Sequence, residues 1–177
     1  MSLNRGVAAL GAVVVVGIAT LAVTIPVAAS QGKPVPNAQA VSGGNWVQTA
    51  PPKDCYNDGK ELSAALQAKC VTSLNNQIKD KKLTKLTVGT GQNVLLHLDK
   101  GAADNGWSAL AVGNADLVTN SKKQGAGPFP ASKIFTSPST GTESSAAIIR
   151  IIEGTSDSKG NQKVYGVWQF ELDKADS

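Results

Sequence analysis

The chain has 177 residues and a formal net charge of +4, from 17 Lys and Arg against 13 Asp and Glu. An excess this small does not predict a nucleic-acid partner, and the basic stretches at 79–85 and 122–123 lack the interleaved aromatic residues of a base-stacking surface. A single histidine, two cysteines and one methionine at the start of the chain are too few for a multi-histidine or cupredoxin-type metal site. We therefore expect neither nucleic acid nor a metal or other cofactor.

Residues 6–29 form an apolar run without a charged side chain, long enough at about 1.5 Å per residue to cross a hydrocarbon core of about 30 Å. Residues 1–30 are thus expected to be an uncleaved membrane anchor or a cleaved secretory signal. The anchor is favoured because the run exceeds the roughly 7–15 apolar residues of a signal peptide, although the small residues at 27–30 would suit cleavage. With Arg5 held in the cytoplasm, the protein is predicted to be a single-pass membrane protein with its carboxyl-terminal domain outside, or a secreted one.

Residues 31–52 mix four prolines with Gly, Ser, Asn and Gln and show neither helical nor strand periodicity. This composition indicates a flexible linker. Trp46 within it is interpreted as the point where the chain begins to dock on the fold, or as a flexible recognition site. The following residues, 53–175, suffice for one hydrophobic core and are expected to form a single exported domain.

A helix is predicted to begin near Lys60, capped by Asn57 or Asp58, because apolar residues recur at every fourth position from 62 to 78. Cys55 precedes this helix and Cys70 lies within it. Their spacing does not fit a thioredoxin-type redox pair, and a zinc site would need further ligands. Because two thiols in an exported domain usually form a disulfide, Cys55 and Cys70 are predicted to pair.

From residue 83 onward the apolar period changes to two, in short segments separated by turn residues. The strands are predicted within 85–89, 92–99, 106–118, 133–138, 144–154 and 164–173. The Gly- and Pro-rich stretch at 125–130 is interpreted as a loop. This regular spacing predicts a mainly β protein, an antiparallel β-sandwich of about seven strands with the helix at its amino-terminal side and with Trp107 and Trp168 in its core.

Three motifs follow one another along residues 53–174: "CYNDGKEL" with a second cysteine after it, "LTVGTGQNVLLHLDKGAADNGW", and "GVWQFELDK". In these motifs the chain resembles an actinobacterial family of exported, often lipoprotein-like domains of unknown function. The resemblance implies a small immunoglobulin-like domain of the cell envelope, and it brings no catalytic residues. Many members of the family begin with a lipobox, whereas this chain has a long hydrophobic run with no cysteine directly after it.

No catalytic site is expected. His97 falls on the strand face opposite Val94, Leu96 and Leu98, which predicts a partly exposed side chain rather than a ligand. A carboxylate pair for glycosidic chemistry would have to combine Asp99 with Asp104, but these residues flank a loop rich in turn formers, where Asp more often caps backbone groups. The Ser-x-x-Lys match at 156–159 lies in a polar hairpin loop and not on a helix.

Loops on a rigid β scaffold commonly carry recognition, so the loops at 101–106 and 122–130 are the expected interaction sites. The predicted function is a non-enzymatic module that binds an unidentified protein or lipid of the cell envelope. Two alternatives stay open, a chagasin-like protease inhibitor, suggested by the similar layout of residues 86–110, and an envelope enzyme of unrecognised kind. The candidate interaction residues are Asp99, Asp104, Asn105, Lys122, Lys123 and Phe129.

Overall fold

A computed structural model describes residues 34–156 and 162–175. The chain divides into two compact units, Met1–Pro34 and Val35–Ser177, and the account below concerns the second. The apolar run at 6–29, expected to meet the membrane, lies outside the described residues. Within the described ranges, no helix combines the length and the apolar character that a membrane crossing requires.

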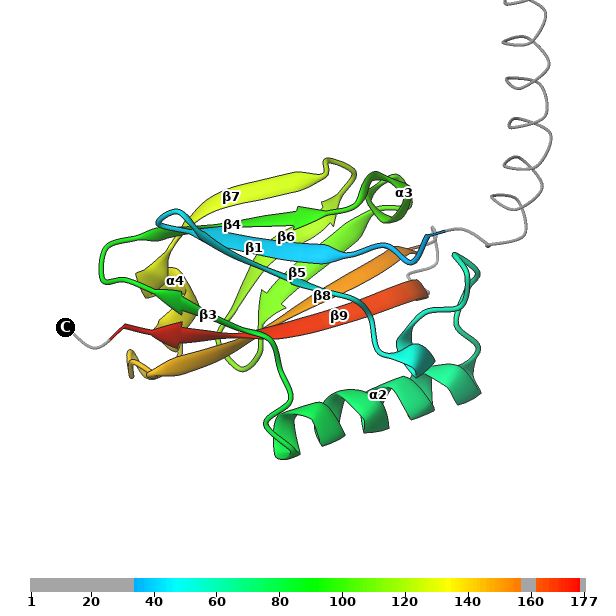
Figure 1. The fold of residues 1–177 in the computed structure, drawn as a ribbon, viewed down its shortest axis with the longest axis horizontal. Helices are drawn as coiled ribbons and strands as arrows, with labels where there is room; N and C mark the ends of the chain where they lie inside the picture. Colours follow the sequence, from blue (N-terminus) through cyan, green and yellow to red (C-terminus); the bar gives the residue numbers. More distant parts are fainter. Residues whose placement is uncertain (1–33, 157–161, 176–177) are drawn as a thin grey trace, which may run out of the picture. The chain divides into compact units, whose positions relative to one another are not determined.

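The second unit is mainly β, as the sequence predicts, and its strands form two sheets (Figure 1). All strand pairs are antiparallel except β3 with β9, which run parallel. The first sheet has the order β2 (Asn45–Thr49), β1 (Ala38–Ser42), β4 (Asn93–Leu98) and β7 (Gly125–Pro130). The second has the order β3 (Lys85–Val88), β9 (Gln162–Lys174), β8 (Ala146–Ser156), β5 (Trp107–Ala111) and β6 (Ala115–Ser121).

The two sheets share one hydrophobic core, because alternate side chains of strands in both sheets point into it. In β4 these are Val94, Leu96 and Leu98, and the intervening residues of that strand are at least partly exposed. Trp107 and Trp168 are both fully buried, which confirms that they are core aromatics. A short helix, α3 (Lys100–Ala103), follows β4 directly and places two alanines in the same core.

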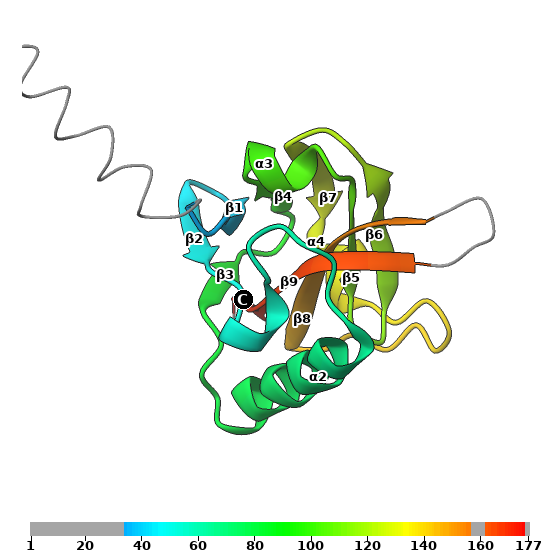
Figure 2. The ribbon, with the colours of Figure 1, turned by 90° about the vertical axis from the view of Figure 1, so that its right-hand side faces the viewer.

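The main helix, α2 (Ala64–Lys79), lies on the side of the second sheet that faces away from the first sheet (Figures 1 and 2). It begins later than predicted, because its N-cap is Ser63, whose hydroxyl accepts a bond from the Leu66 amide at 3.4 Å. Asn57 and Asp58 do not cap it, since the preceding chain is held by a bond from the Leu62 amide to the Val164 carbonyl, 2.7 Å. The prediction of the cap was therefore wrong, and the prediction of the helix correct.

The predicted disulfide is confirmed. Cys55, at the end of the short helix η1 (Lys53–Cys55), is bonded to Cys70 of α2, and their Cα atoms lie 4.7 Å apart. Both cysteines are buried in a small second cluster with Leu74 and Val167, between α2 and β9. The disulfide thus joins the chain that enters the helix to the helix itself, above the outer face of the second sheet.

The interpretation of residues 31–52 as a flexible linker is wrong for residues 38–49. They form the β1–β2 hairpin, and β1 pairs along its length with β4. Ala38, Ala40 and Ser42 are buried against the core. Because these inward residues are small and partly polar, the alternation in β1 lacks the hydrophobic contrast by which the other strands were recognised.

Two further local predictions were wrong. The expected loop at 125–130 is β7, which contains Gly127, Pro128 and Pro130 because it is an edge strand, where a missing amide donor is tolerated. The expected strand at 133–138 is instead largely helix α4 (Ala131–Phe135), whose Ile134 and Phe135 are buried in the core. The described residues therefore form nine strands, where about seven were expected.

Candidate functional site

Five of the six candidate loop residues come from segments that meet at the α3 end of the unit. The Asp99 carboxylate accepts a bond from the Asn37 amide at 2.7 Å, and the Asp104 carboxylate lies 3.4 Å from the Lys100 ammonium. The Lys123 carbonyl accepts a bond from the buried Trp107 indole at 2.7 Å. The bonds of Asp99 and of the Lys123 carbonyl link separate segments at this end, so a structural role explains them, whereas the Lys100–Asp104 pair is exposed on α3.

Phe129 does not belong to this group. It lies in β7 opposite Val94, at the other end of β4 from Asp99, and packs partly buried against the core. The Lys133 ammonium lies 5.7 Å from the centre of its ring. The loop expected for a protease inhibitor also has a different form, because residues 100–103 are the helix α3 and two of them are buried.

A buried carboxylate, Glu153 of β8, was missed by the sequence reasoning. Its side chain is 1% exposed, one oxygen accepts a bond from the Asn105 amide at 2.6 Å, and the other oxygen has no partner among the described residues. Burial raises its pKa to about 7, and the bond from Asn105 opposes part of that rise. The signal was present in the sequence, because Glu153 continues the inward alternation of Ile149 and Ile151.

The groups around Glu153 leave it closed to a substrate. Tyr56 pairs with Gly166 beside it, and the Tyr56 ring lies 6.4 Å from the Trp168 ring. Burial and the charge of Glu153 raise the pKa of Tyr56. With one carboxyl group and no access, this cluster can gain or lose a proton near neutral pH but lacks the second carboxylate of a glycosidase.

A hollow of about 160 Å³ lies where α2 packs beside β8 and β9. Its lining is mainly apolar, with Leu62, Val71 and Ile152 among its members, and it includes Arg150. The Arg150 guanidinium is partly buried, which lowers its pKa, and it donates one bond of 3.4 Å to Gln169. Gln169 in turn donates to the Leu74 carbonyl of α2 at 2.8 Å. The hollow therefore lies at the interface where α2 packs on the sheet.

The sheet β2–β1–β4–β7 has an unusual composition. None of its strand residues is Asp, Glu, Lys or Arg, whereas charged residues make up 17% of the chain. Trp46 of β2 is 63% exposed and Leu95 of β4 is 47% exposed. Because surface positions normally carry most of a domain's charge, an uncharged face with exposed large apolar side chains is a candidate contact surface.

Strand pairing arranges the outward side chains of this sheet in two rows. Val41 of β1 lies opposite both Trp46 and Leu95, which makes an apolar row across three strands. Gln39 lies opposite both Gln48 and His97, which makes a polar row beside it. We call these six residues the uncharged face: Gln39, Val41, Trp46, Gln48, Leu95 and His97.

The polar row consists of two amides and an imidazole, and internal bonds satisfy these groups only in part. The Gln39 amide donates to the Gln48 side-chain oxygen at 3.2 Å, and the Nδ1 atom of His97 is buried and has no hydrogen-bond partner among the described residues. His97 is partly exposed, as predicted. On the far side of the row, β7 places Gly125 opposite His97, so no bulky side chain rises beyond it.

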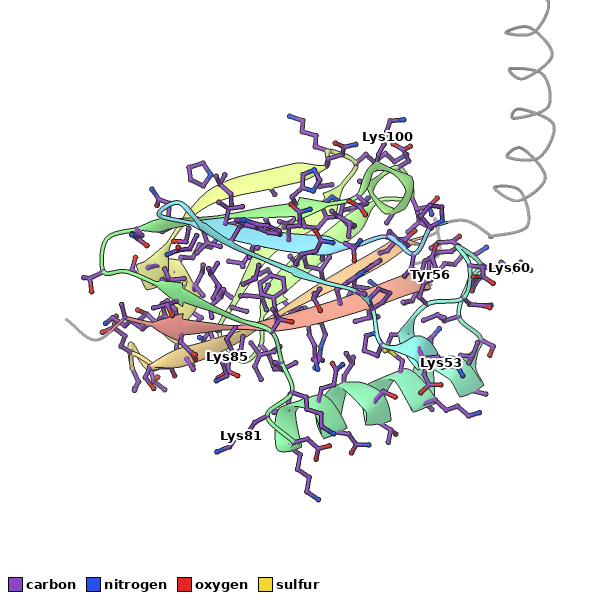
Figure 3. All side chains as sticks on the ribbon, viewed as in Figure 1. Lys53, Tyr56, Lys60, Lys81, Lys85 and Lys100 are labelled. Atoms are coloured by element: carbon purple, nitrogen blue, oxygen red, sulfur yellow. A yellow bond between two sulfur atoms is a disulfide. The ribbon has the colours of Figure 1, made fainter. Side chains whose placement is uncertain are left out.

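The lysines labelled in Figure 3 lie outside the strands of this sheet. Lys53, Lys60, Lys81 and Lys85 lie along the side that carries η1, α2 and β3, and Lys100 lies on α3 at the end of the unit (Figure 3). α2 covers the second sheet and leaves the outward side of the first sheet uncovered (Figure 2). The uncharged face is therefore the best candidate for a functional site on this unit.

Nothing in the described ranges points to a metal centre, since no three His, Cys, Asp or Glu side chains there lie close enough to hold an ion. No protein-family model matches the chain, and comparisons with curated proteins and with solved structures found no match. The described residues thus form a mainly β unit of two sheets around one core, with one disulfide and with an uncharged face on the first sheet.

Proposed function

We propose that residues 35–175 form a non-enzymatic binding module of the cell envelope, built as an immunoglobulin-like β-sandwich. Two sheets that share one core support the sandwich. The disulfide supports a location outside the cytoplasm, where such bonds persist. The apolar run at 6–29 would hold the module at the membrane, or would be removed on secretion.

The observation that carries the proposal is the uncharged face. Its apolar row offers Trp46 and Leu95 to solvent, and leaving such side chains exposed costs free energy that a partner would recover. Tryptophan is also the residue type most often found to dominate the energy of an interface. The face has aromatic, aliphatic and amide groups and carries no paired nucleophile and base, which favours binding over catalysis.

The proposed binding site differs from the loops expected from the sequence. Asp99 and Asn105 are engaged in bonds that link separate segments at the α3 end of the unit, and Asp104 forms an exposed ion pair with Lys100. Lys122 and Lys123 are exposed and precede β7 at that end, whereas the uncharged face consists of residues within the strands of the first sheet. A strand surface is more rigid than a loop, so the rows present a pre-organised contact.

Site-specific photo-crosslinking in the cells that make the protein tests this proposal. A photoreactive phenylalanine analogue is placed at Leu95 on the uncharged face or at Val71, a somewhat more exposed aliphatic residue on α2. We expect ultraviolet light to give adducts of an envelope component from position 95 and none from position 71. Adducts from both positions, or from neither, would contradict a binding site on this face.

A further inference from the structure

We infer that the uncharged face binds a neutral polysaccharide. The inference rests on the proposed function only in using the same face, and it adds the chemical class of the ligand. It follows from three features of the face: the absence of charge in its strands, the exposed indole of Trp46, and the neighbouring row of neutral hydrogen-bonding groups.

The absence of charge selects against ionic ligands. Nucleic acids, acidic polysaccharides and anionic membrane surfaces are bound through Lys and Arg, which supply most of the affinity for such partners. The strands β1, β2, β4 and β7 contain neither residue, and the lysines labelled in Figure 3 lie on other elements. A cationic ligand would likewise find no carboxylate in these strands. A neutral ligand makes no ionic contacts, so the absence of charged side chains does not weaken its binding.

The apolar row fits the carbon-bound hydrogens of a sugar ring. A pyranose has flat faces that carry C–H groups, and an indole offers a large flat π surface whose negative face attracts them. Trp46 is 63% exposed at the edge of the sheet, and Val41 and Leu95 extend the apolar surface from it. With strands about 4.8 Å apart, the row spans about 10 Å, which is roughly the length of two sugar units.

The polar row fits the hydroxyl groups. A sugar hydroxyl both donates and accepts, and so does the side-chain amide of a glutamine. Gln39 and Gln48 lie next to the apolar row on the same face, where they can meet the hydroxyls at the edge of a stacked ring. His97 lies beside them in the same row and is partly exposed, with its Nδ1 atom buried. The bond between Gln39 and Gln48 holds both amides in place before a ligand arrives.

The β7 edge of the uncharged face would allow an extended polymer to continue beyond the face. Beyond His97, β7 turns Gly125 and Pro130 outward, and its Gly127 and Pro128 are also exposed. None of these residues has a long side chain, so they would not sterically block an extended polymer at this edge of the sheet. A second copy of the chain is a less suitable occupant, because pairing two such faces would bury the neutral polar rows against each other.

Affinity electrophoresis of the full chain in neutral detergent tests the inference. The gels contain soluble neutral polysaccharides, namely amylose, mannan, galactan, arabinan or hydroxyethyl cellulose, and a parallel gel contains alginate as an acidic polymer. The variants are Trp46→Ala, Trp46→Phe, which keeps an aromatic ring, and Val71→Ala, which removes an exposed aliphatic side chain on α2.

We expect at least one neutral polysaccharide to retard the native chain, and Trp46→Ala to weaken that retardation by about tenfold or more. Trp46→Phe should keep part of it, and Val71→Ala should keep all of it. Retardation should be unchanged from about 0.05 to about 0.5 M salt, since no ion pair is screened. The inference would be overturned if only alginate retarded the chain or if no gel retarded it. It would also be overturned if the native chain and Trp46→Ala were retarded equally.

Failure of the inference can be told from failure of the proposed function. If no neutral gel retards the chain but position 95 still crosslinks to an envelope protein or lipid, or to a second copy of the chain, the face binds a partner of another class. If both experiments fail, the face is not a binding site.

Discussion

The Asn105 side chain donates a hydrogen bond of 2.6 Å to Glu153, which is 1% exposed and leaves its second carboxylate oxygen without a partner among the described residues. One bond does not offset the cost of burying an ionised carboxylate, so the pKa of Glu153 rises to about 7. The unit therefore contains a group that changes charge near neutral pH inside its core.

Stability should fall as the pH rises across the titration of Glu153. Its ordinary pKa is 4.5 and its folded pKa is about 7, so between these values the folded chain holds the proton more tightly than the unfolded chain. The stability contributed by this group is thus fully present below pH 4.5 and is lost as the pH rises through about 7, a loss on the order of 3 kcal/mol. Urea unfolding at a series of pH values measures this slope.

Glu153→Gln is the matched variant, because the glutamine has the same shape and does not titrate. We expect its stability to lack the fall between pH 4.5 and 7 that the native chain shows. Other carboxylates titrate in both proteins and cancel in the difference. Equal slopes in the two proteins would show that Glu153 is not the group responsible.

Gly166 should not tolerate a side chain. A Cβ atom there would lie 2.5 Å from the Trp168 ring and 2.9 Å from the free oxygen of Glu153, both fully buried. Since the buried ring cannot move away, we expect Gly166→Ala to lower the free energy of unfolding by about 1–3 kcal/mol. The control is Gly101→Ala in α3, where a Cβ would meet no atom within 4 Å and the effect should be small. Equal losses in the two variants would contradict this packing.

The disulfide should contribute a large part of the stability. Cys55 and Cys70 are separated by 15 residues, and opening a loop of that length costs about 3 kcal/mol in the chain-entropy model. We expect Cys55→Ala combined with Cys70→Ala to lower the free energy of unfolding by that order. Thiol labelling of the native, unreduced chain should modify neither cysteine, and labelling of both would refute the bond.

Fluorescence should distinguish Trp46 from the other two tryptophans. Trp107 and Trp168 are fully buried, whereas Trp46 is 63% exposed. A soluble quencher such as acrylamide should therefore reach one component of the emission, and Trp46→Phe should remove that component. Emission that is quenched uniformly, or a quenched component that survives Trp46→Phe, would contradict the placement of Trp46 on an open sheet face.

A strand of this fold could be predicted from the sequence where hydrophobic and polar residues alternate clearly along it. Alternating apolar residues identified β4 and β9, and with β9 the buried Trp168. β1 was missed because its inward Ala38, Ala40 and Ser42 give little contrast, and β7 because proline and glycine at an edge strand look like a loop. The disulfide was predictable because the chain has only two cysteines.

The candidate site was less predictable than the fold. Trp46, Gln39, Leu95 and His97 become neighbours only through the pairing of β1 with both β2 and β4. A single sequence does not specify which strands pair, so the two rows could not be assembled from it. Trp46 had been considered as a recognition residue, but in a flexible linker and not on a sheet.

The central claim, that the uncharged face is a binding surface, is tested most directly by one comparison of affinities. The native chain and Trp46→Ala, first shown to be equally stable to urea, are titrated against envelope fragments from the cells that make the protein. The account predicts that the native chain binds at least about tenfold more tightly than Trp46→Ala, a difference in binding free energy of about 1.4 kcal/mol or more. Equal affinity of the two proteins would contradict it.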